Sequence, residues 1–305
     1  MDVGQFKDFA QLFSIRRNVK DKKLFRENLR QLFHSFHYEG TEYNEQIGIR
    51  KITHLVFGDL HQASYVFVAG YDTAENYLIG NGVHYPFYED RNRAREFINL
   101  TFSLLLSLLV AALGIYLFYR ALSLNIYRKI VMMLAGLIVI IIANKLSRGL
   151  TNRATFSKTA SIFALFELLK KTGHQDKLAY IFLDMGSYSK IGLHFLKTEG
   201  LIRKDQTLIY LDYFGDGDLL AVGSDAKAKA FAEKIRKQYK DPSVYVDLSA
   251  CGANRFDDLE KIVVLSLVKQ DDKEQYYIEH VRTDDDLTIV PEMIDKTVEA
   301  LGKVI

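Results

Sequence analysis

The stretch that decides the fold is "ASYVFVAGYDTAENY", residues 63–77, where a short apolar run ends at a glycine and a carboxylate follows. The run from Tyr65 to Ala69 is rich in β-branched and aromatic residues, which predicts a strand buried on both faces. Gly70 ends the run, and Asp72 lies just past the carboxyl end of the predicted strand. Open α/β sheets hold their binding sites at that edge, so Asp72 is a candidate site residue.

Other predicted elements alternate between helix and strand along the chain. Helical patterns cover 5–38, 158–173 and 225–239, and a last helix begins at Pro291. Predicted strands cover 47–58, which we expect to pair with the strand in 63–77, and then 178–184, 207–215 and 261–268. This alternation predicts an α/β fold with a mostly parallel mixed sheet flanked by helices.

Two apolar segments interrupt this pattern. Residues 97–119 carry no charge and are long enough to cross a bilayer. Residues 130–144 are shorter, but Lys129 and Lys145 bracket them, and lysines at such positions can snorkel to the interface. We expect a transmembrane helical hairpin with spans at 97–119 and 130–146; the alternative is a pair of buried core helices.

The hairpin is predicted to be an insertion within one α/β domain. Residues 39–96 offer only two or three strands, too few for an independent core. The expected organisation is an N-terminal helical segment (1–38), the first part of the domain (39–96), the hairpin (97–146) and the second part (147–305).

Basic residues predict the orientation of the hairpin. Three lie in the connecting loop, and seven lie in the flanks: Arg91, Arg93, Arg95, Lys145, Arg148, Arg153 and Lys158. By the positive-inside rule, the domain and both termini are expected on the cytoplasmic side of the cell membrane. The first thirty residues also lack the apolar stretch of a secretory signal.

Composition excludes several classes of function. The net charge of +2 and the lack of a basic stripe with interleaved aromatics give no indication of a nucleic-acid partner. The single cysteine, Cys251, excludes an internal disulfide and a cysteine-based zinc site.

Five segments, in this order, carry a resemblance to a known family: "VFVAGYDTAE", "SKTASIFALFELLKKTG", "KLAYIFLDMGSYSKIGLHFL", "TLIYLDYFGDGDLLAVGS" and "YYIEHVRTDDDLTIV". The chain resembles the M28 family of zinc-dependent aminopeptidases over residues 20–305, apart from the hairpin. The resemblance implies a zinc-exopeptidase-like fold and a two-zinc site at the carboxyl edge of the sheet.

The same resemblance implies that most of the metal ligands are missing. Only Asp212 matches a ligand, and Asp72 matches the carboxylate that orients a ligand histidine. The other ligand positions of the family fall on residues with unsuitable side chains: Gly70, Thr155 or Phe156, Gly186, Ser187 and Arg282. A single carboxylate does not hold a catalytic zinc, so no cofactor and no catalytic residue are expected.

Two hypotheses concern the remnant site, which comprises Asp72, Asp212, Arg282 and His280. In the first, Arg282 forms an ion pair with Asp212 and Asp72 and so replaces the charge of the metal. In the second, a shifted zinc site uses Asp212 and His280, with carboxylates such as Glu75, Asp184 or Asp218 nearby.

The sequence thus favours a membrane-anchored, cytoplasm-facing pseudopeptidase that acts as a binding or scaffold partner. Its expected partners are the lipid bilayer and another membrane or membrane-associated protein; the oligomeric state is left open. The alternatives are an active metal-dependent aminopeptidase with an atypical site and an accessory subunit of a membrane complex. Small residues such as Gly114 and Gly136 permit close helix contact, either within the hairpin or with a partner.

Overall fold

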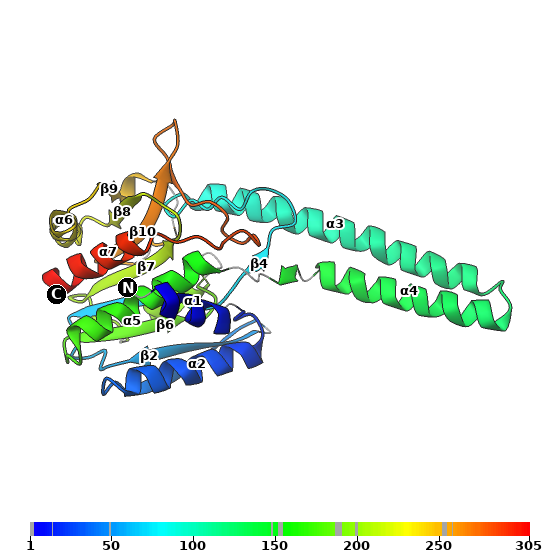
Figure 1. The fold of residues 1–305 in the computed structure, drawn as a ribbon, viewed down its shortest axis with the longest axis horizontal. Coiled ribbons are helices and arrows are strands. Elements are labelled where there is room, and N and C mark those ends of the chain that lie inside the picture. The colour runs from blue at the N-terminus through cyan, green and yellow to red at the C-terminus, as the bar shows by residue number, and fades with distance from the viewer. Residues whose placement is uncertain are drawn as a thin grey trace.

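An α/β domain carries a long helical hairpin that projects from one side (Figure 1). The computed structural model describes residues 3–13, 15–48, 50–147, 149–151, 155–186, 191–198, 201–251, 255–257 and 259–305. The C-terminus lies at the edge of the domain away from the hairpin (Figure 1).

The core of the domain is a mixed sheet. In the described chain it has nine strands, eight of them in the order β1-β2-β6-β3-β7-β10-β8-β9, while β11 pairs with β10. The four neighbours β6, β3, β7 and β10 are parallel, and antiparallel pairs flank them. The strands are β1 (Gly40–Ile47), β2 (Arg50–Phe57), β3 (Tyr65–Gly70), β6 (Leu178–Leu183), β7 (Thr207–Phe214), β8 (Leu219–Ser224), β9 (Ser243–Asp247), β10 (Ile262–Gln270) and β11 (Tyr276–Tyr277).

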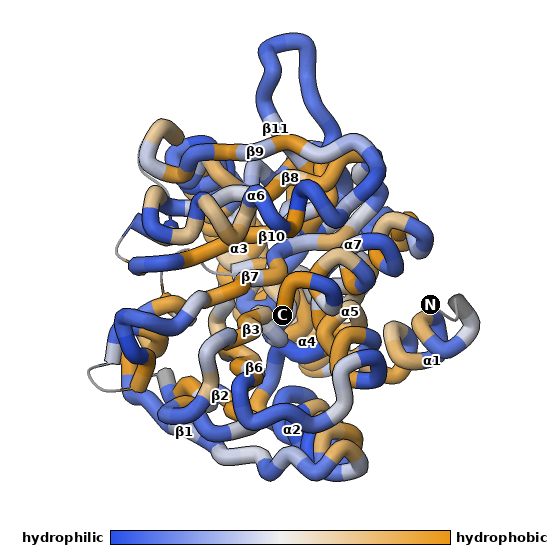
Figure 2. Tube along the Cα trace, turned by 90° about the vertical axis from the view of Figure 1, so that its left-hand side faces the viewer, coloured by the Kyte–Doolittle hydropathy of each residue, from blue (hydrophilic) through white to orange (hydrophobic). Residues whose placement is uncertain are grey.

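Helices cover one face of this sheet, which confirms the predicted fold class (Figure 2). They are α1 (Val3–Leu12), α2 (Val19–His34), α5 (Phe156–Thr172), α6 (Lys229–Gln238) and α7 (Pro291–Val304). The other face is covered by loops, including the segment just before α3, and by two short 3-10 helices, η1 (Gly192–Lys197) and η2 (Leu248–Ala250). Every residue of β6 and β7 is buried, as the apolar runs in their sequences predict, and the buried residues of β7 include Asp212.

Three local expectations differ from the structure. The helical region 5–38 is two helices, because Asn18 caps α2 by accepting a hydrogen bond of 2.9 Å from the amide of Asp21. Within 47–58 the strand begins only at Arg50, and Ile47 belongs to β1, whose polar sequence gave no strand signal. Strands β2 and β3 are not neighbours, because β6 pairs with both and lies between them.

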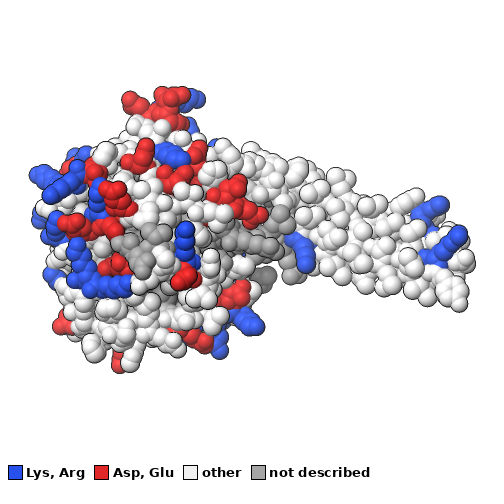
Figure 3. Space-filling model, viewed as in Figure 1, with Lys and Arg blue, Asp and Glu red and all other residues white. Residues whose placement is uncertain are grey.

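The hairpin consists of α3 (Glu89–Ala121) and α4 (Ile126–Ser147). Both helices are long and apolar enough to cross a membrane, and only 17% and 11% of their most apolar windows are buried. The alternative of buried core helices is therefore wrong. Charged side chains are absent from the visible middle of the hairpin and reappear at its tip (Figure 3).

Small residues form the contact between α3 and α4. A Cβ atom on Gly114 would lie 2.8 Å from a side-chain atom of Ile140 and 3.1 Å from the carbonyl oxygen of Gly136. The hydroxyl of Ser107 donates to the carbonyl of Ala143 at 2.9 Å. The glycines therefore serve close packing within the hairpin, one of the two uses left open by the sequence.

Replacing Gly114 with leucine should loosen the hairpin, since the first added atom already overlaps Ile140. In detergent, we expect the midpoint of thermal helix loss, followed by circular dichroism, to fall by about 5 °C. Ala112→Leu introduces the same side chain at an exposed position of α3, with three added carbon atoms instead of four, and should leave the midpoint unchanged. Equal midpoints for both variants would show that the close contact contributes little.

Candidate functional site

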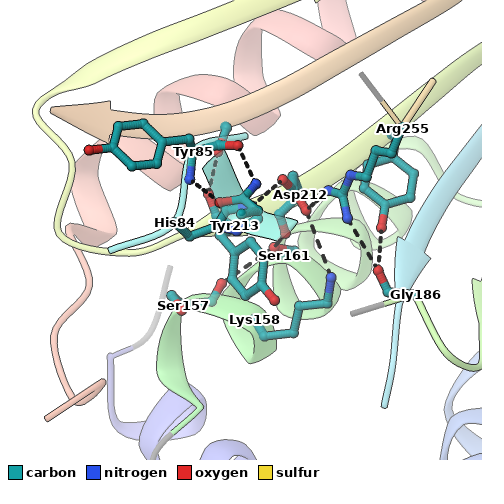
Figure 4. Close-up of polar contacts among 12 residues, drawn as sticks. His84, Tyr85, Ser157, Lys158, Ser161, Gly186, Asp212, Tyr213 and Arg255 are labelled. Atoms are coloured by element: carbon teal, nitrogen blue, oxygen red, sulfur yellow. Dashed lines mark hydrogen bonds and ion pairs between the residues drawn. The ribbon is translucent and has the colours of Figure 1, made fainter. Parts of the chain in front are cut away.

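The candidate site centres on Asp212, which lies near the carboxyl end of β7 and has no exposed surface. Three basic side chains surround its carboxylate (Figure 4). Arg255 forms a close ion pair with it, the Nζ atom of Lys158 lies 3.9 Å from Oδ1, and Nε2 of His84 lies 3.4 Å from Oδ2. Lys158 and Arg255 are themselves buried, so this is a charge cluster inside the protein.

Burial and the neighbouring charges shift the pKa values of the side chains in this cluster. Burial alone would raise the pKa of Asp212, but Arg255, His84 and Lys158 hold that pKa well below its usual range. Burial lowers the pKa of Lys158 to about 8, against the opposing effect of Asp212. The pKa of His84 is also lowered by burial, so its imidazole is neutral near pH 7. The cluster at neutral pH therefore contains one anion and two cations.

Lys158 reaches Asp212 from the first turn of α5. The carboxylate of Asp286 holds this turn, because it accepts hydrogen bonds from the amide and the hydroxyl of Ser157 at 2.9 and 2.7 Å. Burial raises the pKa of Asp286 to about 7. The ammonium group of Lys158 lies 4.5 Å from the centre of the Tyr213 ring, so its positive charge faces the aromatic ring as well as Asp212.

Two glycines make room for the lysine. A Cβ atom on Gly70, at the end of β3, would lie 2.9 Å from Nζ of Lys158 and 3.0 Å from the Cα atom of Gly186. A Cβ atom on Gly186, after β6, would lie 2.6 Å from the Cα atom of Gly70. The ends of these neighbouring strands touch through their backbones, and no side chain fits at either position without rearrangement.

The structure brings together part of the predicted remnant site. Asp72 is buried beside the cluster, where its charge acts on Lys158 and Arg16. Thr155 is buried before α5, and Phe156 packs edge-on against Phe6, 5.3 Å between ring centres. Ser187 lies outside the described residues.

The predicted ion pair between Arg282 and Asp212 is wrong. Arg282 pairs instead with Glu96 at 3.0 Å and with Glu75 at 3.5 Å, and its guanidinium lies over the ring of Tyr77. The cause is the backbone: Arg282 has φ of 64°, and its carbonyl accepts a hydrogen bond from the amide of Tyr77. The segment is thereby turned toward the base of the hairpin.

His280 is not the histidine at Asp212. It also adopts a positive φ, 61°, and its carbonyl accepts from the amide and hydroxyl of Thr283. The imidazole at Asp212 comes from His84, whose backbone pairs with Ile278 in an isolated bridge. Among the described residues, no group of three His, Cys, Asp or Glu side chains lies close enough to hold a metal ion.

A cavity of about 1130 Å³ lies between the carboxyl edge of the sheet and the base of the hairpin. Asp72 and Asp184 line it at the sheet, while Phe97 and Leu100 of α3 line it at the hairpin. Asp184 forms an ion pair with Lys22 from α2 and accepts a hydrogen bond of 2.8 Å from the amide of Met185. The lining of this cavity does not include Asp212, Lys158 or Arg255, which lie deeper.

At its base the hairpin is joined to the domain by a second, small sheet. Strand β4 (Glu75–Asn76) pairs antiparallel with β5 (Leu150–Thr151), so the segments entering and leaving the hairpin are hydrogen-bonded. Arg17 adds a further hydrogen bond between the domain and the hairpin, because its guanidinium donates to the carbonyl of Gly149 at 3.1 Å. The loop between α1 and α2 therefore contacts the foot of the hairpin.

No family model and no curated protein matches the sequence. Solved structures do match. The glutaminyl cyclase of Porphyromonas gingivalis aligns with a TM-score of 0.57 at 11% identity, over 99% of this chain and 94% of that one. The chain shares the fold of these enzymes.

Two further structures agree with this result. The glutaminyl cyclase of Bacteroides thetaiotaomicron, solved with bound N-acetylhistamine, has a TM-score of 0.56 at 11% identity, over 99% of this chain and 94% of that chain. The LapA aminopeptidase of Legionella pneumophila has a TM-score of 0.53 at 10% identity, over 99% of this chain and 68% of that chain. The aminopeptidase-like fold inferred from five sequence segments is thus confirmed as a fold, while the likeness to glutaminyl cyclases was not anticipated.

Proposed function

We propose that this chain is a membrane-anchored protein with an aminopeptidase-like fold that binds a partner or ligand and lacks metal-dependent peptidase chemistry. The observation that carries the proposal is the cluster at Asp212, where two buried cations lie on a carboxylate that the family resemblance places among the metal ligands. A zinc ion needs at least three protein ligands, and it would be repelled by Lys158 and Arg255. The donor set does not fit a catalytic zinc.

The two glycines support the same proposal. A histidine at position 70 would collide with Lys158, and a glutamate at position 186 would collide with the backbone of Gly70. Lys158 and the glycine pair are therefore mutually dependent, and restoring a single ligand would not restore a site. We keep the hypothesis that a protein cation replaces the charge of the metal. Lys158 and Arg255, instead of Arg282, are the cations that compensate Asp212.

Anchoring follows from the exposed apolar surface of the hairpin. Side chains such as Leu109, Tyr119 and Val131 are about two-thirds exposed or more, and water would oppose their exposure along two long helices. A bilayer would cover this surface, with the domain on the cytoplasmic side by the positive-inside rule. Carbonate washing of membranes should leave the full chain in the pellet.

The cavity at the edge of the sheet is the proposed binding region. It is of a size that holds small molecules or peptide segments, and it lies where α/β folds bind ligands. A ligand there would contact Asp72 and Asp184 but not the buried cluster. Another membrane protein remains the proposed macromolecular partner, as in the scaffold hypothesis.

Metal analysis tests the proposal directly. The detergent-purified full chain would be exposed to zinc, desalted and analysed by elemental mass spectrometry, with aminopeptidase and glutaminyl cyclase activities measured in parallel. We expect less than about 0.1 zinc ion per chain and no turnover. One or two retained zinc ions, with cleavage or cyclisation of an N-terminal residue, would overturn the proposal in favour of an active metalloenzyme.

A further inference from the structure

We propose that the tip of the hairpin binds anionic phospholipids, with Arg120, Arg128 and Lys129 contacting the lipid phosphates. The tip comprises the end of α3, the connecting loop 122–125 and the first turn of α4. These lipids belong to the far leaflet, which is the leaflet on the side of the membrane opposite the domain. The inference rests on the proposed membrane anchoring and names the class of lipid that the anchor prefers.

The tip carries positive charge that no acidic side chain compensates. Arg120 and Arg128 are exposed, and Lys129 is partly buried. The sequence has no Asp or Glu between Glu96 and Glu167, so every acidic residue belongs to the domain or to the base of the hairpin, at the opposite end from the tip (Figure 1). Within the described chain, no hydrogen bond or ion pair occupies the three basic side chains, and their N–H donors are available.

The length of the hairpin places this charge at the far headgroups. At about 1.5 Å per residue, the uncharged stretch 97–119 is about 34 Å long, slightly more than the hydrocarbon core of about 30 Å. Tyr119 and Tyr127, which are 72% and 80% exposed, lie on either side of the loop. Exposed tyrosines are typical of the boundary between hydrocarbon and headgroups. With the base of the hairpin at one surface of the bilayer, the three basic residues therefore lie among the headgroups of the other.

The chemistry of the tip favours an anionic lipid over a zwitterionic one. Orientation does not explain a basic tip, because short loops on the far side of a membrane are usually poor in Lys and Arg. A guanidinium group binds phosphate oxygens through paired N–H donors, and an ammonium group adds a point charge. A zwitterionic headgroup brings a cation of its own, whereas an anionic headgroup compensates the positive charge of the tip.

A single tryptophan at the tip tests the inference, because the chain has none of its own. Tyr127→Trp is reconstituted as the full chain in vesicles of equal parts phosphatidylcholine and phosphatidylglycerol. Bromine on the acyl chains of one lipid quenches a tryptophan that touches that lipid, so two preparations, each with one lipid brominated, compare the neighbours of the tip. We expect quenching that corresponds to about a fivefold enrichment of phosphatidylglycerol over phosphatidylcholine.

Two triple variants, both made with Tyr127→Trp, assign the enrichment to the tip. The tip variant combines Arg120→Gln, Arg128→Gln and Lys129→Gln, and in it both brominated lipids should quench equally. The control removes the same charge from exposed lysines in and just after α6, on the side of the domain away from the hairpin (Figure 1), and it should keep the enrichment. Its substitutions are Lys234→Gln, Lys237→Gln and Lys240→Gln.

The outcomes separate this inference from the anchoring on which it rests. Equal quenching by both lipids in Tyr127→Trp would overturn the lipid preference, in favour of an acidic segment of a partner protein as the ligand of the tip. Enrichment that survives in the tip variant, or that is lost in the control, would overturn the assignment to the three basic residues. A tryptophan that neither brominated lipid quenches would lie outside the bilayer and would refute the proposed anchoring as well.

Discussion

Replacing Arg255 with methionine should lower the free energy of unfolding by about 3–5 kcal/mol, because it removes the closest counter-charge of a buried carboxylate. Lys158, at 3.9 Å, would remain as the one described cation within ion-pair distance of Asp212. The chain has no tryptophan, so near-ultraviolet circular dichroism of tyrosines in the sheet is a suitable probe during urea titration in detergent.

Two further variants distinguish the loss of charge from the loss of packing in the stability effect of Arg255→Met. Arg203→Met makes the same change at an exposed ion pair with Asp205 and should cost no more than about 1 kcal/mol. Arg255→Met combined with Asp212→Asn removes both members of the closest ion pair, and because the two residues are in contact, the double variant should lose less stability than the sum of the two single variants. An Arg255→Met variant as stable as Arg203→Met would show that water, rather than protein cations, compensates Asp212.

Replacing Gly186 with alanine should destabilise the protein by about 3 kcal/mol, because the added methyl group would lie 2.6 Å from the Cα atom of Gly70. The contact is backbone against side chain, so no rotamer change relieves it, and β3 and β6 must move apart. The same urea titration measures the effect.

Gly302→Ala is the matched control, since it adds the same methyl group where the nearest atom is 3.4 Å away. Because Gly302 lies within α7, alanine there should stabilise the protein by about 0.5–1 kcal/mol. If Gly186→Ala were also neutral or stabilising, the close approach of the two strand ends would impose no constraint, and side chains at these positions would be compatible with the fold.

The central strands and the location of the candidate site could be predicted from sequence for one physical reason. Strands β3, β6 and β7 are buried on both faces, so their sequences are continuous apolar runs, and each run ends in or near a carboxylate: Asp72, Asp184 and Asp212. The edge strand β1 is half exposed and polar, and it left no comparable signal.

The partners of Asp212 could not be predicted, because each depends on tertiary placement. Lys158 directly precedes a stretch of α5 without charged residues, "TASIFALF". A lysine at the border of such a stretch was the available sign that Lys158 is buried. Arg255 lies in a turn outside the helices and strands, and the position of His84 is set by its bridge to Ile278. Order along the chain pointed to Arg282, but two residues with positive φ turn that segment away.

The position of β3 between β6 and β7 also constrains how the protein is made. During synthesis, β3 leaves the ribosome before the hairpin, whereas both of its neighbours follow the hairpin. At about 5–20 residues per second, the strand waits roughly seven to thirty seconds for them. Its apolar surface stays exposed for that time, so we expect the nascent chain to depend on a chaperone until translation has passed Phe214.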